Sequence, residues 1–378
     1  MKSLLKAGAV GLLLLAGFAR AEKKSAAGTH VGVTKRVFHP TNLIRNWRGD
    51  PEKDLRVTVW YPAVDTAVEV KQVIGPPGAP LFEAGMAAPD APLAPGASGS
   101  KGKGWPMILL SHGTGGSAMQ MGWLGTALAQ AGFIAVAVDH PGNNADGKLT
   151  AEGFALWWER ATDLSQVLDG MLADPEFGKR IDQDRIGAAG FSIGGYTVLE
   201  LAGAQTDIAE LYVGCRQNAD RAGCVVPEMR GLTGDLKTPD DFLHAVRKTS
   251  GESLARSGEL FSDDRIGAVF AIAPALGYTQ TEESLRAIRT PVEMVVGDDD
   301  RTAPAKENAE YVRSQVRGAR LTILPHVQHY TFLDVCTAEG KAKLGQYCED
   351  HADVDREAVH EKVAGLAVVF FAKALKVK

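Results

Sequence analysis

A serine stands between two glycines at the point where an apolar run gives way to a helical pattern. The run 186–191 is typical of a buried strand, and Gly190-Phe191-Ser192-Ile193-Gly194 fits the pattern G-x-S-x-G. Residues 196–202, which follow, favour a helix. A strand, a sharp turn and a helix in this order hold a serine hydroxyl out of the sheet, and bulk beside it would collide with the neighbouring elements. We therefore predict that Ser192 is a catalytic nucleophile.

A serine hydroxyl is a weak nucleophile that needs a general base, and the base needs an acid that orients it. In a parallel α/β sheet these groups lie on loops after later strands, in the order serine, acid, histidine. The acid is expected in the segment 297–304, directly after a predicted strand, where Asp298, Asp299 and Asp300 compete.

The base is expected one strand further along the chain. The segment 325–333 follows another predicted strand and contains two histidines, His326 and His329. Both are of the residue type that most often takes a proton from a serine. The remaining histidines of the chain are expected to have structural or surface roles.

Two backbone amides should bind the negative oxygen of the tetrahedral intermediate. One is the amide of Ile193, which follows the nucleophile, and the other should come from the glycine-rich loop 111–116. In that loop we expect the amide of Thr114 to serve. His112 precedes the serine in the chain, so we expect it to have a structural role. Residues 139–143, which follow a further strand, are expected to line the pocket.

Strands and helices alternate along most of the chain, as is typical of a mostly parallel sheet with helices on both faces. The predicted strands are 31–38, 54–61, 106–111, 133–138, 186–191, 266–273, 292–296 and 321–324. The predicted helices are 118–131, 154–172, 193–204, 305–316 and 358–375. We therefore predict an α/β fold that places the candidate residues at the carboxyl ends of its strands.

Two segments interrupt this alternation. Residues 63–104 are rich in Gly, Pro and Ala, and we expect a long, partly mobile surface loop there. Residues 205–264 carry many charges and weak helical patterns, which favour a helical cap over the carboxyl edge of the sheet. A loose surface excursion is the alternative for this second segment.

The start of the chain has the pattern of a secretory signal peptide. Two lysines precede an apolar run at 7–19, and Ala19-Arg20-Ala21 is a small-x-small cleavage site. The run is short for a membrane span, and no later stretch is long and apolar enough. We therefore expect cleavage near Ala21, a single domain over 22–378, and a secreted or periplasmic protein.

Loss of this segment, which has three basic residues and no acidic one, would take the formal net charge from −5 to −8. A mildly acidic chain without a basic stripe argues against nucleic-acid binding.

The four cysteines are Cys215, Cys224, Cys336 and Cys348. An even number in an exported chain favours disulfides, and two local pairs are the simplest of three connectivities. Free buried thiols are the alternative. The spacings lack the C-x₂-C pattern of zinc sites, and His351 does not complete one, so we predict no metal site.

With these residues assembled, the chain resembles the α/β-hydrolases. More narrowly, it is similar to the bacterial group called predicted dienelactone hydrolases, which is related to platelet-activating-factor acetylhydrolases. The motifs that carry the resemblance are Val59-Trp60-Tyr61-Pro62, Ser111-His112-Gly113-Thr114-Gly115-Gly116, Asp139-His140-Pro141-Gly142, Gly190-Phe191-Ser192-Ile193-Gly194-Gly195, the segment 297–304, and His329-Tyr330-Thr331-Phe332-Leu333 leading to Cys336. The resemblance implies an α/β-hydrolase fold with a Ser-His-Asp triad.

The resemblance also selects among the competing residues. In such hydrolases the acid usually stands three residues after a glycine and four before a proline, which selects Asp300, and the histidine usually precedes an aromatic-rich Phe-Leu turn, which selects His329. In the acetylhydrolases the acid follows the strand after the nucleophile, but 271–275 contains no carboxylate here. True dienelactone hydrolases use a cysteine nucleophile, so the serine of this chain favours ordinary ester hydrolysis.

The expected function is therefore hydrolysis of small-molecule carboxylic esters through an acyl-enzyme, without a cofactor. Three alternatives remain at this point: an amidase or peptidase with the same triad, a polymer-degrading esterase, and a non-catalytic binding protein on the hydrolase fold.

Overall fold

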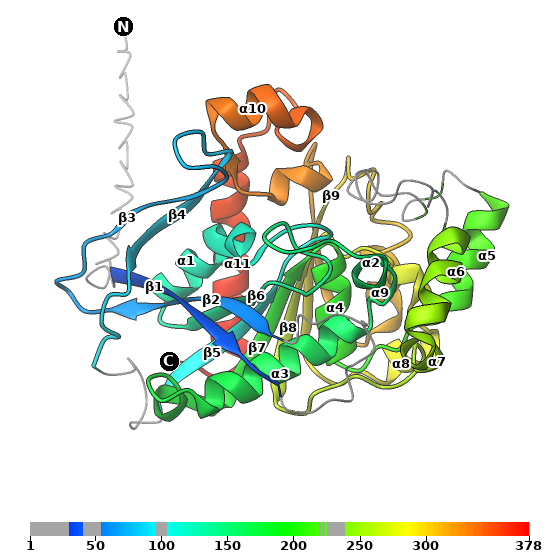
Figure 1. Cartoon of the computed structure of the whole chain (residues 1–378), viewed down its shortest axis with the longest axis horizontal. Helices are drawn as coiled ribbons and strands as arrows, with labels where there is room; N and C mark the ends of the chain where they lie inside the picture. Colours follow the sequence, from blue (N-terminus) through cyan, green and yellow to red (C-terminus); the bar gives the residue numbers. More distant parts are fainter. Residues whose placement is uncertain are drawn as a thin grey trace, which may run out of the picture.

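The computed structural model describes residues 30–40, 54–95, 104–218, 221, 224 and 239–377. The predicted signal peptide and its cleavage site lie outside the described residues. A mixed, mostly parallel sheet crosses the centre of the molecule and helices pack on both sides of it (Figure 1). The predicted α/β-hydrolase architecture is confirmed in its sheet and its flanking helices.

The sheet has the strand order β10-β9-β8-β7-β5-β6-β2-β1-β4-β11, and β3 pairs with β4. The strands are β1 (His30–Phe38), β2 (Leu55–Ala63), β3 (Val70–Ile74), β4 (Phe82–Pro89), β5 (Trp105–Ser111), β6 (Ile134–Val138), β7 (Ile181–Phe191), β8 (Ile266–Ile272), β9 (Val292–Gly297), β10 (Arg320–Leu324) and β11 (Val335–Cys336). The six strands from β5 to β10 are parallel, and β2 joins β6 antiparallel. Every residue of β5 and of β6 is buried, which explains their continuous apolar sequences.

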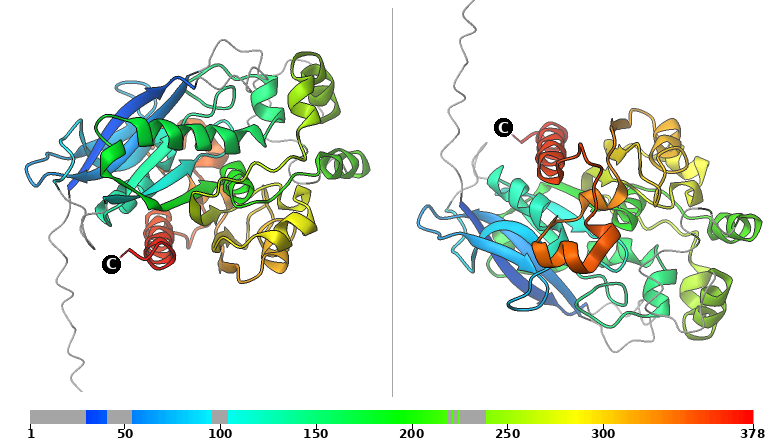
Figure 2. Two further views of the ribbon diagram at one scale, coloured as in Figure 1. Left: turned by 90° about the horizontal axis from the view of Figure 1, so that it is seen from below. Right: turned by 90° about the horizontal axis from the view of Figure 1, so that it is seen from above.

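Helices cover the two faces in separate groups. The longer ones are α1 (Gly122–Gln130), α3 (Glu159–Ala173), α4 (Ile193–Leu201), α5 (Ile208–Gln217), α6 (Pro239–Thr249), α9 (Ala309–Gln315), α10 (Ala338–Leu344) and α11 (Arg356–Ala374). The shorter ones include α2 (Ala151–Ala155), α7 (Gly251–Ala255), α8 (Glu282–Ala287), and the 3-10 turns η2 (Ala118–Met121) and η6 (His329–Phe332). α1 packs against α11, and α3 packs against α4; Figure 2 shows α3 and α11 on opposite sides of the strands. Among the described residues, no helix combines the length and apolar character of a membrane span.

The expected surface loop at 63–104 is wrong for most of its described length, because β3 and β4 form within it and pair with each other. β4 also joins β1, and its outer face packs beneath α1. A Cβ on Gly122 of α1 would overlap the Ala84 carbonyl, and one on Gly85 would crowd Thr126. The small residues that suggested a loop therefore permit a close approach of strand and helix.

The predicted helix 154–172 is divided in two. α2 ends at Ala155 and α3 begins at Glu159, so the chain turns at residues 156–158. The indole of Trp157 donates a hydrogen bond back to the Phe154 carbonyl across this turn. Phe154 and Trp157, on the two sides of this turn, both line the pocket described below.

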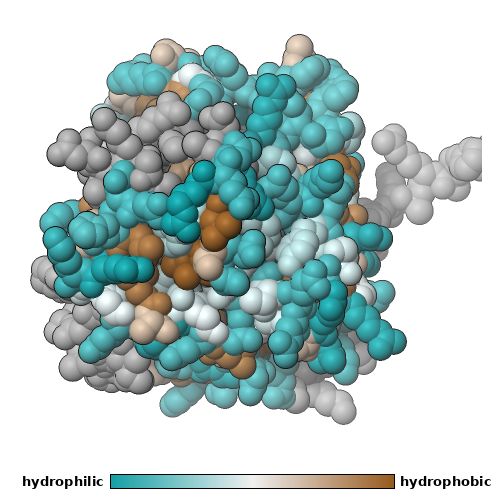
Figure 3. All heavy atoms as spheres, turned by 90° about the vertical axis from the view of Figure 1, so that its right-hand side faces the viewer, coloured by the Kyte–Doolittle hydropathy of each residue, from teal (hydrophilic) through white to brown (hydrophobic). Residues whose placement is uncertain are grey.

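The segment 205–264 contains α5, α6 and α7 within its described part, at the right of Figure 1. On this side of the molecule, apolar side chains gather near the middle of the face, among hydrophilic ones (Figure 3). Ile208, Leu243 and Leu254 line a surface groove between these helices. α5 also reaches the pocket, to which it contributes Leu211 and Tyr212.

Candidate active site

Ser192 lies at the tight turn between β7 and α4. Its backbone has φ 58° and ψ −121°, an uncommon conformation for a residue with a side chain, and its amide donates to the Ile272 carbonyl at 2.9 Å. A Cβ on Gly190 would overlap the Gly194 carbonyl, and one on Gly194 would overlap that of Ser111. Both glycines of the G-x-S-x-G pattern are thus required by close backbone contacts. The turn directs Ser192 toward the pocket, which it lines.

Three predicted residues form a continuous hydrogen-bonded series. Nε2 of His329 is 2.9 Å from Oγ of Ser192, and Nδ1 of His329 is 2.7 Å from Oδ2 of Asp300. The other oxygen of Asp300 accepts hydrogen bonds from the amides of Thr302 and Ala303 at 3.0 and 2.7 Å. All three side chains are buried, so the imidazole is held in one orientation between an acid and a hydroxyl.

The competing residues lie outside this series. Asp298 accepts the backbone amide of His326 at 2.6 Å, and Asp299 accepts from the Gln328 side chain at 3.1 Å. Both aspartates therefore join the loop after β9 to the loop after β10. The imidazole of His326 is exposed and contacts Asp353 at 2.6 Å.

The predicted oxyanion residues border the same pocket as the nucleophile. Ile193 and Thr114 both line it beside Ser192. The neighbouring amide of Gly115 is already used, because it donates to Oδ1 of Asn143 at 2.7 Å. This bond anchors the glycine-rich loop directly after Thr114, and the assignment of the Thr114 and Ile193 amides stays a prediction.

The expectation that residues 139–143 line the pocket is wrong, because none of them is among its described lining residues. They lie behind the glycine-rich loop and support it. Asp139 accepts the Ala118 amide at 2.6 Å, and burial raises the pKa of this carboxyl. Asn143 holds Gly115 on one side and donates to the Gly153 carbonyl at 3.0 Å on the other.

A second Ser-His-Asp series lies beneath this loop. Nε2 of His140 is 2.9 Å from Oγ of Ser111, and its Nδ1 is 2.8 Å from Asp163. Each of these three side chains is at most 1% exposed, and Arg160 also reaches the Ser111 hydroxyl at 3.3 Å. A substrate carbonyl has no access to Ser111, so this series is suited to supporting the loop rather than to nucleophilic attack.

His112 is part of the same support. Its Nδ1 donates to the Gly113 carbonyl at 2.6 Å, and its Nε2 accepts the His140 amide at 3.2 Å. Burial lowers the pKa of His112 well below its usual value, and the positive charge of Arg160 lowers it further. The ring is therefore neutral and has the structural role that its position before the nucleophile predicted.

Ser192 and His329 lie at the wall of a cavity of about 340 Å³. Its described lining is mainly apolar and aromatic and includes no Asp, Glu, Lys or Arg side chain. The principal side chains are Phe82, Leu149, Phe154, Trp157, Leu211, Tyr212, Leu276, Tyr330, Leu333, Leu344 and Tyr347. Of these residues, the sequence analysis named only Tyr330 and Leu333, as part of the motif that begins at His329, and did not assign either of them to a pocket. The pocket suits a neutral, apolar ligand.

The four cysteines form the two local disulfides, Cys215–Cys224 and Cys336–Cys348. Each borders the pocket, because Cys224 lines it directly and Cys348 follows the lining residue Tyr347. The rings of Tyr330 and Tyr347 meet edge to face, with centroids 4.7 Å apart. The disulfides therefore constrain two separate segments that contribute to the pocket lining.

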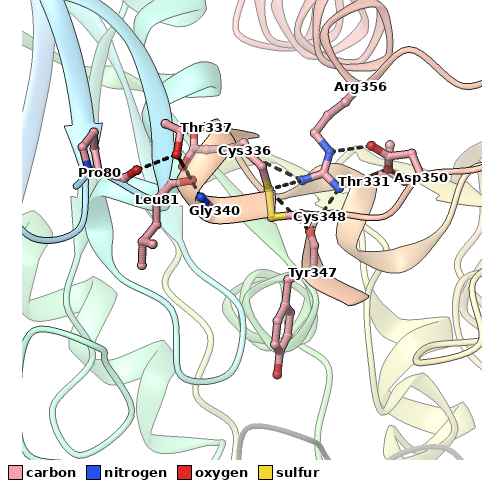
Figure 4. The surroundings of a disulfide bond; sticks show 11 residues. Pro80, Leu81, Thr331, Cys336, Thr337, Gly340, Tyr347, Cys348, Asp350 and Arg356 are labelled. Atoms are coloured by element: carbon pink, nitrogen blue, oxygen red, sulfur yellow. Dashed lines mark hydrogen bonds and ion pairs between the residues drawn. A yellow bond between two sulfur atoms is a disulfide. The ribbon is translucent and has the colours of Figure 1, made fainter. Parts of the chain in front are cut away.

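The surroundings of Cys336–Cys348 are tied to the rest of the fold (Figure 4). The buried guanidinium of Arg356 contacts Asp350 at 2.9 Å and donates to the Tyr347 carbonyl at 3.0 Å. The hydroxyl of Thr337 donates to the Pro80 carbonyl, which lies just before β4. Tyr347 is therefore held through its carbonyl by Arg356, next to a disulfide whose other cysteine precedes Thr337.

Comparison with known proteins gives two family matches. Residues 108–338, more than half of the chain, match the model of the alpha/beta hydrolase family. Residues 20–151 match the model of platelet-activating factor acetylhydrolase, isoform II. No curated protein sequence matches the chain. Among solved structures, the ferulic acid esterase from Streptomyces cinnamoneus is similar, with a TM-score of 0.60 and 19% identity over 93% of this chain and 92% of that one.

Proposed function

Since this chain belongs to the alpha/beta hydrolase family, we propose that it is a serine hydrolase that cleaves carboxylic esters. In this proposal Ser192 attacks the ester carbonyl while His329 takes the hydroxyl proton and passes it to the leaving alcohol. Asp300 holds the imidazole and stabilises its charged form. Water activated by His329 then hydrolyses the acyl-enzyme, and the cycle requires no cofactor.

The oxyanion of each tetrahedral intermediate is bound by the amides of Ile193 and Thr114. Ile193 is also the first residue of α4, so its end of the helix favours negative charge. The loop that carries Thr114 is kept in place by Asn143, which holds the adjacent amide. A donor fixed before the reaction stabilises the developing charge without reorganisation.

The proposed substrate is a neutral small-molecule ester with an apolar or aromatic portion. The support is the uncharged described lining of the pocket and its aromatic side chains, including Trp157 and Tyr330. The acetylhydrolase match over 20–151 and the name of the ferulic acid esterase agree with ester hydrolysis. A serine in the nucleophile position favours ordinary esters over dienelactones.

We also propose that the protein is exported as a single domain, 22–378, with a cap at 205–264, after cleavage near Ala21. Two disulfides fit an oxidising compartment outside the cytoplasm. The contacts of α5 with the pocket support the cap, since Leu211 and Tyr212 belong to this helix.

The observation that carries the proposal is the 2.9 Å contact between His329 Nε2 and Ser192 Oγ at the pocket wall. The test is turnover of a chromogenic short-chain ester by Ser192→Ala, with Ser111→Ala as the matched control. We expect Ser192→Ala to lose several orders of magnitude in kcat and Ser111→Ala to stay within about tenfold of the wild type. Wild-type turnover by Ser192→Ala would contradict the proposal. A matched anilide, hydrolysed faster than the ester, would favour the amidase instead.

A further inference from the structure

Outside the pocket, two histidines and one aspartate bring their ligand atoms together at the surface. The donor atoms of His326, His351 and Asp353 all lie within 4.8 Å of one another. Nδ1 of His326 contacts one carboxylate oxygen of Asp353 at 2.6 Å, and Nδ1 of His351 contacts the other. The three side chains are 54, 50 and 57% exposed, so solvent and ions reach them.

Both segments that carry these side chains are anchored. The backbone of His326 has φ 59° and its amide is held by Asp298 at 2.6 Å. On the other segment, the ion pair of Asp350 with Arg356 and the bond from the Val354 amide to the His351 carbonyl, both 2.9 Å, fix the turn. The donor atoms therefore converge from two backbone segments that are already positioned.

We propose that His326, His351 and Asp353 bind a zinc-type divalent cation. Two imidazoles and one carboxylate suit Zn²⁺, which takes nitrogen ligands at about 2.0–2.1 Å and carboxylate oxygen at about 2.0–2.2 Å, with water at the remaining position. Calcium is a poor fit, because it takes 6–8 oxygen ligands. The three residues are not part of the described pocket lining. They come from two loops: His326 lies on one, and His351 and Asp353 lie on the other. His326 and Asp353 are 27 positions apart in the chain.

The ion would join two loops that both border the active site. His326 stands three residues before His329 on the loop after β10, and His351 follows the disulfide residue Cys348 by three. A cation between them would cross-link the segment that carries the proposed base to the segment that carries the pocket residue Tyr347. Binding to the folded state alone raises thermal stability in proportion to the logarithm of the free ion concentration.

The experiment is calorimetric titration of the chelator-treated full-length folded protein with Zn²⁺, with thermal unfolding as a second readout. We expect one ion per chain and an increase in Tm. His326→Ala and His351→Ala should each weaken binding by more than the roughly 10- to 100-fold that loss of an outer-shell partner costs. His39→Ala is the matched control, because His39 is an exposed histidine paired with a single aspartate, Asp54, at 2.6 Å.

Two further arms locate the ion. Protein whose active site is blocked by a fluorophosphonate should bind Zn²⁺ as the free protein does, and excess Ca²⁺ should not displace it. The proposal is overturned if the wild type binds no Zn²⁺, or if His326→Ala and His351→Ala bind it with wild-type affinity. It is also overturned if the fluorophosphonate abolishes binding, since the ion would then occupy the active site, or if His39→Ala loses it. The titrations of the wild type and of the histidine variants do not depend on ester hydrolysis, so they test the cation site even if the proposed triad is wrong.

Discussion

Nε2 of His329 lies 2.9 Å from Oγ of Ser192, although 137 positions separate the two residues in the chain. One stands at the turn after β7 and the other at the start of η6, after β10. Parallel strands bring these two loops to one edge of the sheet, where ligands of α/β folds bind. The contact thus follows from the topology of the sheet.

The acid of the proposed triad is tested by two neighbouring substitutions. Asp300→Asn should lower kcat by about 10⁴-fold, because the neutral amide does not stabilise the charged imidazole and favours the wrong tautomer of the ring. Asp299→Asn should cost less than about tenfold, since Asp299 contacts Gln328 and Arg301 instead. Ester hydrolysis measured at saturation compares the two, and a reversed ranking would move the acid to Asp299.

The glycine-rich loop is tested through Asn143. Asn143→Ala removes the acceptor of the Gly115 amide and should loosen the adjacent amide of Thr114. We expect kcat to fall by about 10- to 100-fold, less than the 10²–10³ that deletion of an oxyanion donor costs, with a smaller change in KM. Steady-state kinetics on the folded variant separate the two parameters. A change in KM alone would indicate that Asn143 affects only substrate binding.

The disulfides are expected to contribute to stability by similar amounts. Replacement of either pair by two serines should lower the free energy of unfolding by about 3 kcal/mol, since each closes a short loop, of separation 9 or 12. Urea unfolding of the two double variants measures this. Both variants should also raise KM, since Cys224 lines the pocket and Cys348 follows the lining residue Tyr347, so an unchanged KM would argue against a role for the corresponding segment.

A buried carboxyl makes stability depend on pH. Glu200 accepts the hydroxyls of Tyr196 and Thr206, both at 2.6 Å, and burial raises the pKa of Glu200 from 4.5 to about 8. Between these values the folded state holds a proton that the unfolded chain has released, so this group destabilises the fold as pH rises from about 4.5 to about 8.

Glu200→Gln should therefore weaken that pH dependence. Compared with the wild type, the variant should have a higher relative free energy of unfolding at pH 8 than at pH 5. Urea unfolding of the wild type and the variant at both pH values measures this difference in the free energy of unfolding. The control is Glu361→Gln, at an exposed position. An identical pH dependence for wild type and Glu200→Gln would show that Glu200 is already charged in the folded protein.

Much of the central sheet and the serine turn could be predicted from the sequence, because buried parallel strands are continuous apolar runs and the glycines beside Ser192 leave a local signature. The strands β3 and β4 could not be predicted in this way. Small residues such as Ala84 and Gly85 are typical of loops, and their role in packing against α1 is visible only in the folded structure. Composition alone does not distinguish a flexible segment from one in which small residues permit close packing.

The supporting residues of the site were not predictable for a related reason. Asp163 contacts His140 because α3 packs beneath the loop after β6. No sequence motif links these two residues, so their contact could not be predicted. Likewise Tyr347 meets Tyr330 through the Cys336–Cys348 segment, which the alternation of strands and helices did not include. Tertiary packing determines these contacts, so sequence spacing does not reveal them.

The most direct test of the account is the position of a covalent label. The protein is treated with an active-site fluorophosphonate, digested, and the modified peptide identified by mass spectrometry. We expect one label per chain, on Ser192, and none on the buried Ser111. A label on another residue, or no label on active protein, would contradict the proposed triad.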